Sequence, residues 1–343
     1  MYFDIAMPLT LLAVVAISVL MSGKVEKRLK AVFEEREFKT KDAIILVAAI
    51  TVTVSVVTFI PLLAVVTLFL FAFSLLLFIF AYIFSDCRKA VAKLCSMAFF
   101  VASFLIATLS FFMLFPLYIY VAYGALALYC LCGFSMVALF YEETRQHVRE
   151  RWYLAAMPSV LFVILYVFFN RTPIWFPYLL DTYSLIFAVL ITLYLGGLFT
   201  WKTSLVFTGL LTIADTVLVL VTGAMVSAAT HLSDLGLPVF VILPTIPRVA
   251  TNKGTLLVSL GLGDFFFSGL LAIQTYKKFG KSVAFLSTAT MAFSFFMFEM
   301  FMFNFGVTAF PGTLMIISGW VPIVLLKYVM DKKSRNRVIS LLP

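Results

Sequence analysis

The chain has 343 residues, of which 64% are hydrophobic and 12% charged, and its mean hydropathy is +1.12. Soluble domains have about 45–50% apolar and about 25% charged residues, so this composition excludes a soluble protein and predicts a polytopic membrane protein. The net charge of +9 is interpreted as a signal of membrane orientation, and no nucleic-acid partner is expected. Four cysteines without CxxC spacing and only two histidines form no ligand cluster, so we expect no metal and no cofactor.

Apolar stretches of about 20 residues, the length that crosses a bilayer as a helix, follow one another along the whole chain. Two of these stretches, 43–84 and 95–141, are too long for one crossing, and Pro61 and Pro116 therefore predict tight turns between antiparallel helices. The N-terminus lacks a basic region before its first apolar stretch, so we expect a retained span. The sequence predicts an all-α transmembrane helix bundle with about eleven spans: residues 2–21, 43–60, 62–84, 95–115, 117–141, 153–169, 179–200, 204–230, 255–276, 282–303 and 307–329.

Basic residues predict the orientation of these spans. With the N-terminus outside and the C-terminus in the cytoplasm, all of the 25 lysines and arginines fall on the cytoplasmic side except Arg171, Arg248 and Lys253. This distribution follows the positive-inside rule. The excess positive charge also predicts attraction to anionic membrane lipid.

Two aspartates lie alone in long apolar runs, Asp215 in residues 204–230 and Asp264 in residues 254–276. A carboxylate at bilayer depth costs about 2.5–3.5 kcal/mol on insertion scales, so two of them in neighbouring spans indicate a shared polar site. Two facing carboxyls can share one proton, which leaves one as general base and the other as general acid for activating water. Gly261 and Gly263 precede Asp264 and give the backbone room for a partner helix or an extended substrate.

The surroundings of Asp264 resemble a known motif. Residues 260–268 read Leu-Gly-Leu-Gly-Asp-Phe-Phe-Phe-Ser and are similar to the LGLGD-aromatic motif of the presenilin and signal peptide peptidase family, which consists of intramembrane aspartyl proteases. The family's other catalytic aspartate lies on the preceding helix, where Asp215 stands. Residues 237–241 (Leu-Pro-Val-Phe-Val) resemble the LPV segment of archaeal-type members. The family's third motif, Pro-Ala-Leu at the start of the last helix, matches residues 311–313.

The resemblance implies a catalytic role for Asp215 and Asp264. It also implies motif or substrate-binding roles for Gly261, Leu262, Gly263, Pro311, Gly312 and Thr313. The chain departs from the family at Ala214, where a tyrosine is usual, and at Gly312 and Thr313, which replace alanine and leucine. Thr313 is expected to supply a hydroxyl that partly replaces the tyrosine's, and restoring the family pattern with Gly312→Ala and Thr313→Leu is expected to be tolerated.

Laid on the chain, the family's nine-helix core implies a protease domain at 62–343 and a peripheral transmembrane hairpin at 1–61. The expected activity is hydrolysis of peptide bonds within transmembrane or signal-peptide helices. The loop between the two aspartate spans lies outside, which resembles the signal peptide peptidase branch. Accessory subunits are therefore not expected.

Other interpretations of the two aspartates stay open. A proton- or sodium-coupled transporter is the main functional alternative, because membrane acids commonly mark ion paths. A buried hydrogen-bonded site without chemistry is a second one, and a type IV prepilin peptidase a third. Glu299, on the penultimate span, is expected to have a structural or hydration role, and Asp181 is expected to lie at a span boundary, exposed to water.

Overall fold

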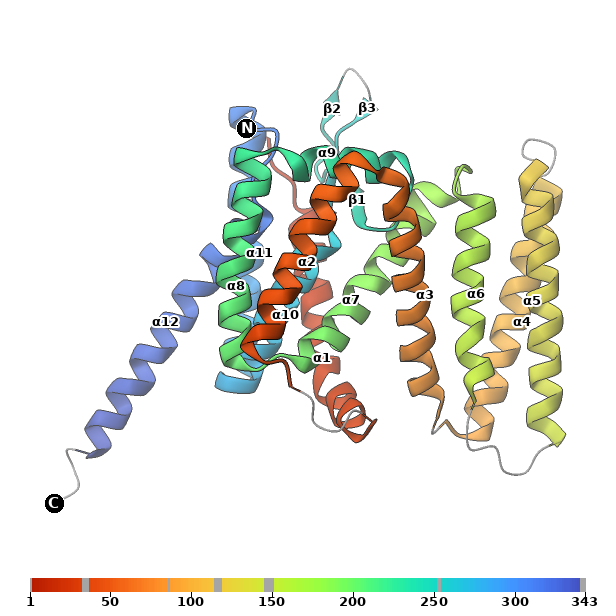
Figure 1. The fold of residues 1–343 in the computed structure, drawn as a ribbon, viewed down its shortest axis with the longest axis horizontal. Helices are drawn as coiled ribbons and strands as arrows, with labels where there is room; N and C mark the ends of the chain where they lie inside the picture. The colour runs from red at the N-terminus through yellow and green to blue at the C-terminus, as the bar shows by residue number, and fades with distance from the viewer. Residues whose placement is uncertain are drawn as a thin grey trace. The chain divides into compact units, whose positions relative to one another are not determined.

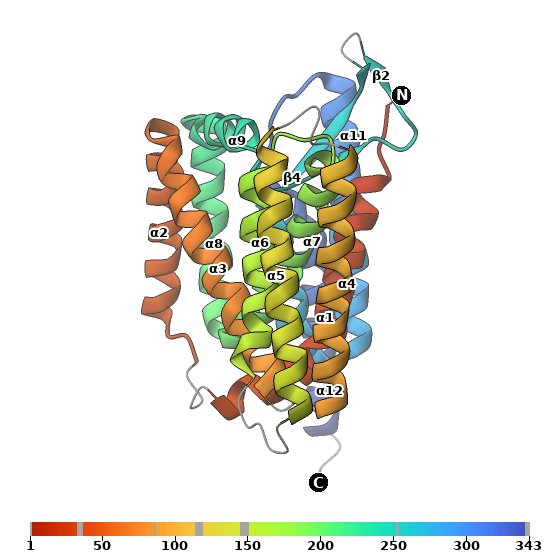
Figure 2. The same ribbon diagram turned by 90° about the vertical axis from the view of Figure 1, so that its right-hand side faces the viewer.

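The computed structural model describes residues 2–32, 37–85, 87–113, 119–144, 151–251 and 254–339. Among these residues, ten helices are long and apolar enough to cross a membrane. The chain is thus a multi-pass membrane protein with a predominantly helical fold, which confirms the coarse prediction (Figures 1 and 2). It divides into two compact units, one formed by Met1–Pro61 with Asp181–Pro343 and the other by Leu62–Leu180.

The first unit carries both aspartates and consists of helices and two small sheets. Its elements are α1 (Ala6–Val32), α2 (Thr40–Phe59), α7 (Leu180–Leu198), α8 (Trp201–Thr216), the π-helical turn η2 (Val217–Val221), α9 (Ala224–Asp234), β1 (Phe240–Pro244), β2 (Ala250–Thr251), β3 (Gly254–Thr255), β4 (Leu257–Gly261), α10 (Leu262–Phe279), α11 (Lys281–Phe305) and α12 (Gly312–Ile339).

Helix α10 forms the centre of this unit. It packs against α1, α8, α11 and α12, and every residue from Phe265 to Thr275 is buried. A helix that is apolar on all faces is expected to be enclosed by other helices, as α10 is. Trp320 on α12 donates its indole N–H to Thr275 Oγ1 (2.9 Å), and Gln274 donates to the Phe199 carbonyl oxygen (2.7 Å). These bonds satisfy the polar groups of the central helix within the protein.

The span predicted at 255–276 is wrong at its N-terminal end. Its first residues form β3 and β4, and the helix begins only at Leu262. Strand β4 pairs antiparallel with β1, in a register that runs from Phe240 opposite Gly261 to Pro244 opposite Leu257. The predicted all-α helix bundle thus also contains two small two-stranded sheets among the described residues, β1–β4 and β2–β3.

The span predicted at 204–230 is also two elements. The helical run that begins with α8 ends after η2, and Gly223 adopts a left-handed conformation with φ of 66°. Glycine takes this conformation without the steric penalty of a Cβ atom. Helix α9 then runs across the end of α8 (Figure 1) and packs against α2.

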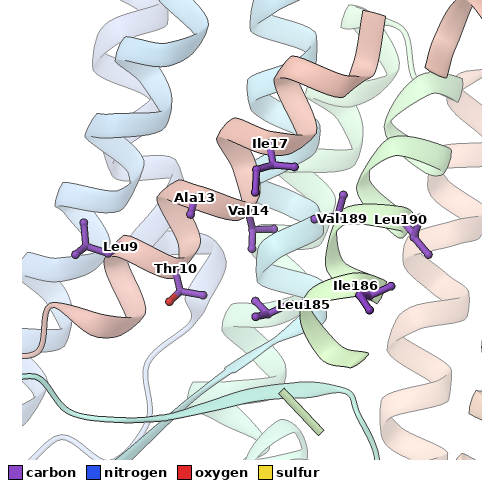
Figure 3. A pocket seen from close by; sticks show the side chains of 9 residues that line it. All are labelled: Leu9, Thr10, Ala13, Val14, Ile17, Leu185, Ile186, Val189 and Leu190. Atoms are coloured by element: carbon purple, nitrogen blue, oxygen red, sulfur yellow. The ribbon is translucent and has the colours of Figure 1, made fainter. Parts of the chain in front are cut away.

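Helix α1 is integrated into the unit of the aspartates, and the domain bounds 1–61 and 62–343 stay a prediction. Met7, Leu11 and Val15 of α1 are at most 1% exposed and belong to the same hydrophobic core as the phenylalanines of α10. On its other side α1 lies beside α7, and the two helices border an apolar groove of about 590 Å³ (Figure 3). Its lining is aliphatic except for Thr10, whose hydroxyl donates to the Ala6 carbonyl oxygen (2.8 Å).

The second unit is built from α3 (Pro61–Ser85), α4 (Lys89–Met113), α5 (Ile119–Thr144), α6 (Trp152–Phe169) and the π-helical turn η1 (Trp175–Leu179). The interruption of the helix predicted at Pro61 is confirmed, since α2 ends at Phe59 and α3 begins at Pro61. The predicted turn at Pro116 lies outside the described residues.

A buried ion pair ties together three segments of the second unit. Arg151 Nε donates to Glu142 Oε1 (2.7 Å), and the Tyr153 hydroxyl donates to the same oxygen. A second guanidinium nitrogen of Arg151 donates to the carbonyl oxygen of Cys87, in the connection between α3 and α4. Glu142 is fully buried and Arg151 is 7% exposed, so each charge depends on the other for its solvation.

Candidate active site

Asp215 lies on α8, one residue before the helix changes to the π-helical turn η2. Its side chain is half-buried, and one of its oxygens is fixed by α12. Thr313 donates two hydrogen bonds to Asp215 Oδ2, from its backbone N–H (3.2 Å) and from its hydroxyl (2.7 Å). The hydroxyl that the sequence predicts beside the site is therefore in contact with Asp215, and Oδ1 is left available to another partner.

Asp264 lies in the first turn of α10, where β4 passes directly into the helix. The N-cap of α10 is Gly261, in an extended conformation (φ −72°, ψ 149°), and Asp264 follows three residues later. The sheet thus fixes the start of the helix, because the Leu262 N–H donates to the Val239 carbonyl oxygen (2.9 Å). Leu262, the motif residue between the two glycines, packs against the hydrophobic core and so helps to hold the start of α10 in place.

The two aspartates meet at the first turn of α12. A Cβ atom built on Gly312 would lie 2.3 Å from Asp264 Oδ1, while the next residue, Thr313, holds Asp215. The two carboxyls are also close enough to interact electrostatically. Pro311 directly precedes this turn, and its carbonyl oxygen accepts the N–H of Leu314 (3.1 Å), which starts the helix. The structure therefore brings together both predicted aspartates and residues 311–313.

The two glycines before Asp264 differ in what surrounds them. Among the described residues, no atom lies within 4 Å of a Cβ built on Gly263. A Cβ built on Gly261 would make ordinary contacts, 3.5 Å from Asp264 Oδ2 and 3.8 Å from the Phe240 ring. Of the two predicted reasons for these glycines, space for a neighbouring helix is excluded at Gly263, and space for a substrate stays a prediction.

The expectation that Gly312→Ala is harmless needs correction. A contact of 2.3 Å is far inside normal van der Waals separation, so an alanine methyl group forces the Asp264 carboxyl to move. Thr313→Leu is not neutral for the site either, because it removes the hydroxyl that donates to Asp215. In this chain Gly312 leaves room for the Asp264 carboxyl, and the Thr313 hydroxyl donates a hydrogen bond to the Asp215 carboxyl.

Comparison with known proteins adds no further information on the site. No protein-family model and no curated protein sequence matches this chain. Among the described residues there is also no group of three or more histidine, cysteine or acidic side chains that could hold a metal ion. The chemistry of the site is therefore inferred from the two carboxyls and the turn of α12 beside them.

Glu299 lies apart from the two aspartates, in a different polar environment. It is 4% exposed, and neither of its carboxyl oxygens has a hydrogen-bond partner among the described residues. The charged group that interacts with it is Asp4. Asp4 accepts hydrogen bonds from the N–H groups of Ala6 (3.0 Å) and Met7 (3.0 Å), at the start of α1, and of Ile246 (2.7 Å).

Two residues of α7 bind strand β1, a role that the sequence analysis did not predict for them. Asp181, expected to be exposed, accepts a hydrogen bond from the N–H of Ile242 in β1 (2.7 Å). Ser184 is fully buried and donates to the carbonyl oxygen of Phe240 (2.7 Å). Both contacts join residues about 60 positions apart in the chain, so no local pattern in the sequence indicates them.

Proposed function

We propose that this protein is an intramembrane aspartyl endopeptidase that hydrolyses peptide bonds within transmembrane or signal-peptide helices. The observation that carries the proposal is the convergence of Asp215 and Asp264 on one turn of α12. Two carboxyls in this position can share a proton, so that one acts as general base while the other acts as general acid. The motif resemblance around Asp264 supports the same reaction.

In the proposed reaction, the ionised carboxyl takes a proton from water while the oxygen of that water attacks the scissile carbonyl carbon. The protonated carboxyl donates its proton to the carbonyl oxygen, which gives a neutral gem-diol. The carboxyl that took the proton from water then donates it to the amide nitrogen, while the other, now ionised, accepts a proton from a gem-diol hydroxyl. The C–N bond breaks, an amine and an acid are released, and the pair again holds one proton. Thr313 donates two hydrogen bonds to Asp215 Oδ2, and we propose Oδ1 as the oxygen that takes the proton from water.

A helical substrate must be extended locally before its peptide bonds become accessible, because internal hydrogen bonds shield them. Strand β4 offers a place for an extended segment. Among the described residues it pairs on one edge with β1 and has no strand on its other edge. A free edge can bind an added strand through its backbone groups. Gly261 ends this strand and the exposed Gly263 directly precedes Asp264, so neither of these residues adds a side chain between the strand and that carboxyl.

The proposed orientation has the N-terminus outside and the C-terminus in the cytoplasm, as the distribution of basic residues favours. An odd number of crossings, as given by the ten candidate spans together with α10, agrees with the proposed termini on opposite sides. The site then has the orientation of the signal peptide peptidase branch. The proposed enzyme acts without accessory subunits, on membrane-embedded substrates.

The test is cleavage of a transmembrane peptide by the purified full-length protein in proteoliposomes. Asp215→Asn and Asp264→Asn keep the shape of each side chain and should each lower the rate by about 10²–10⁴-fold, the usual contribution of acid–base catalysis. Glu299→Gln is the matched control, because this buried carboxyl does not touch the pair. Undiminished cleavage by either aspartate variant would refute the two-aspartate mechanism. Ion flux that needs both acids, with no cleavage of any peptide, would favour the transporter.

A further inference from the structure

Strand β1 has one edge in the sheet and one edge turned away from it. The Leu262 N–H donates to the Val239 carbonyl oxygen (2.9 Å), so Val239 faces β4. In an antiparallel ladder the residues that bond to the partner strand alternate with residues whose backbone groups point away. Phe240 and Ile242 therefore direct their N–H and C=O groups to the outer edge of β1.

Two side chains of α7 occupy this outer edge. Ser184 Oγ donates to the Phe240 carbonyl oxygen (2.7 Å), and Asp181 Oδ1 accepts the Ile242 N–H (2.7 Å). Their spacing of three residues places both on one face of the helix, and the two strand residues they bind are two positions apart. The hydroxyl donor of Ser184 thus meets a carbonyl oxygen of β1, and the carboxyl acceptor of Asp181 meets an N–H group of the same strand. This edge is closed by α7, whereas the outer edge of β4 has no strand partner among the described residues.

We infer that Asp181 and Ser184 are positioning residues that fix β1, and through it β4 and the first turn of α10, against the rest of the site. The inference rests on the proposed protease function, because its consequence is a fixed alignment of the substrate. Strand β4 passes into α10 without an intervening loop, so a displacement of the strand displaces Asp264. A shift of one residue in strand pairing also turns every side chain to the opposite face. The two contacts thus determine which peptide bond reaches the aspartates.

The first test is the cleavage position, measured by mass spectrometry of the fragments of one transmembrane peptide. Asp181→Leu and Ser184→Ala should spread cleavage over neighbouring bonds, whereas Asp181→Asn should keep the wild-type bond because an amide oxygen still accepts the Ile242 N–H. Ser287→Ala is the matched control, since this buried serine on α11 bonds only within its own helix, to Ala284 (2.8 Å). A loss of folded protein lowers the yield of fragments but does not move the position of cleavage.

The second test does not depend on activity. Amide hydrogen exchange of β1 and β4 should become roughly tenfold faster in Asp181→Leu, as expected for the loss of one hydrogen bond, and should stay close to the wild-type rate in Asp181→Asn. Unchanged exchange together with wild-type cleavage positions in Asp181→Leu and Ser184→Ala would overturn the inference. If the wild-type protein cleaves no peptide, the protease proposal fails, and the exchange measurement alone decides whether Asp181 and Ser184 hold the strand.

Discussion

Replacing Gly312 by alanine tests the close contact between α12 and Asp264 directly. The new methyl carbon would lie 2.3 Å from Asp264 Oδ1, 2.7 Å from Cγ and 2.9 Å from Oδ2. An ordinary carbon–oxygen contact is longer by about 1 Å, so the carboxyl must retreat by about that distance. A misplacement of about 1 Å can cost about 10²-fold in rate, or about 2.7 kcal/mol of transition-state stabilisation. Folding should be little affected, because the atoms that must move belong to the end of one side chain and not to the backbone.

The assay is the initial rate of peptide cleavage in proteoliposomes, with the melting temperature in detergent as the measure of folding. Gly209→Ala is the matched control, because it makes the same change on α8 where no described atom lies within 4 Å of the new methyl group. We expect normal melting for both variants and slow cleavage only for Gly312→Ala. A wild-type rate for Gly312→Ala, the residue of the resembling family, would show that the active arrangement of Asp264 does not use the space beside Gly312.

Three further predictions concern polar contacts and helix packing. Thr313→Val removes the hydroxyl but keeps the backbone donor to Asp215 (3.2 Å), so cleavage should slow by about tenfold, the equivalent of one hydrogen bond. Thr313→Ser keeps a hydroxyl and should retain the wild-type rate. Equal rates for the two variants would contradict a role for the hydroxyl. Gly319→Ala places a methyl carbon 2.3 Å from a backbone oxygen of α11 and should destabilise the protein by about 1–3 kcal/mol, measured by unfolding in detergent, with Gly209→Ala as control. Glu142→Leu leaves Arg151 buried without its partner and should cost about 3–5 kcal/mol in the same measurement, whereas a loss below about 1 kcal/mol would show that water reaches the guanidinium.

The sequence predicts most of the helices because hydropathy reports directly on burial in lipid. It fails where an apolar run changes its conformation without changing its hydropathy. Residues 257–261 read Leu-Val-Ser-Leu-Gly and form a strand, although they join a longer apolar run that was interpreted as a helix. Short apolar runs do not distinguish a buried strand from a helix by periodicity. The charges at Asp264, Lys277 and Lys278 also keep α10 out of the ten described helices that are apolar enough to cross a membrane, although the sequence predicts a span there.

The convergence of the aspartates with residues 311–313 could be predicted from the sequence only through the motif resemblance. The contacts of Asp4 and Asp181 could not be predicted, because their partners in the chain are far away. Asp4 does carry one local signal, since an aspartate just before an apolar helix is a common N-cap. The packing of α1 against α10 could not be predicted from the sequence either, because the order of spans along a chain does not determine which of them pack together.

The start of two helices at the site has an electrostatic consequence. Asp264 lies in the first turn of α10, and the Thr313 N–H that binds Asp215 belongs to the first turn of α12. The macrodipole of a helix gives its N-terminus a partial positive charge, worth about 0.3–1 kcal/mol to a nearby anion and up to about 2 kcal/mol when partly buried. Neither α8 nor the segment 254–276 has a basic side chain beside the aspartates. The N-termini of α10 and α12 thus supply a partial positive charge that stabilises an ionised carboxylate at this pair of aspartates.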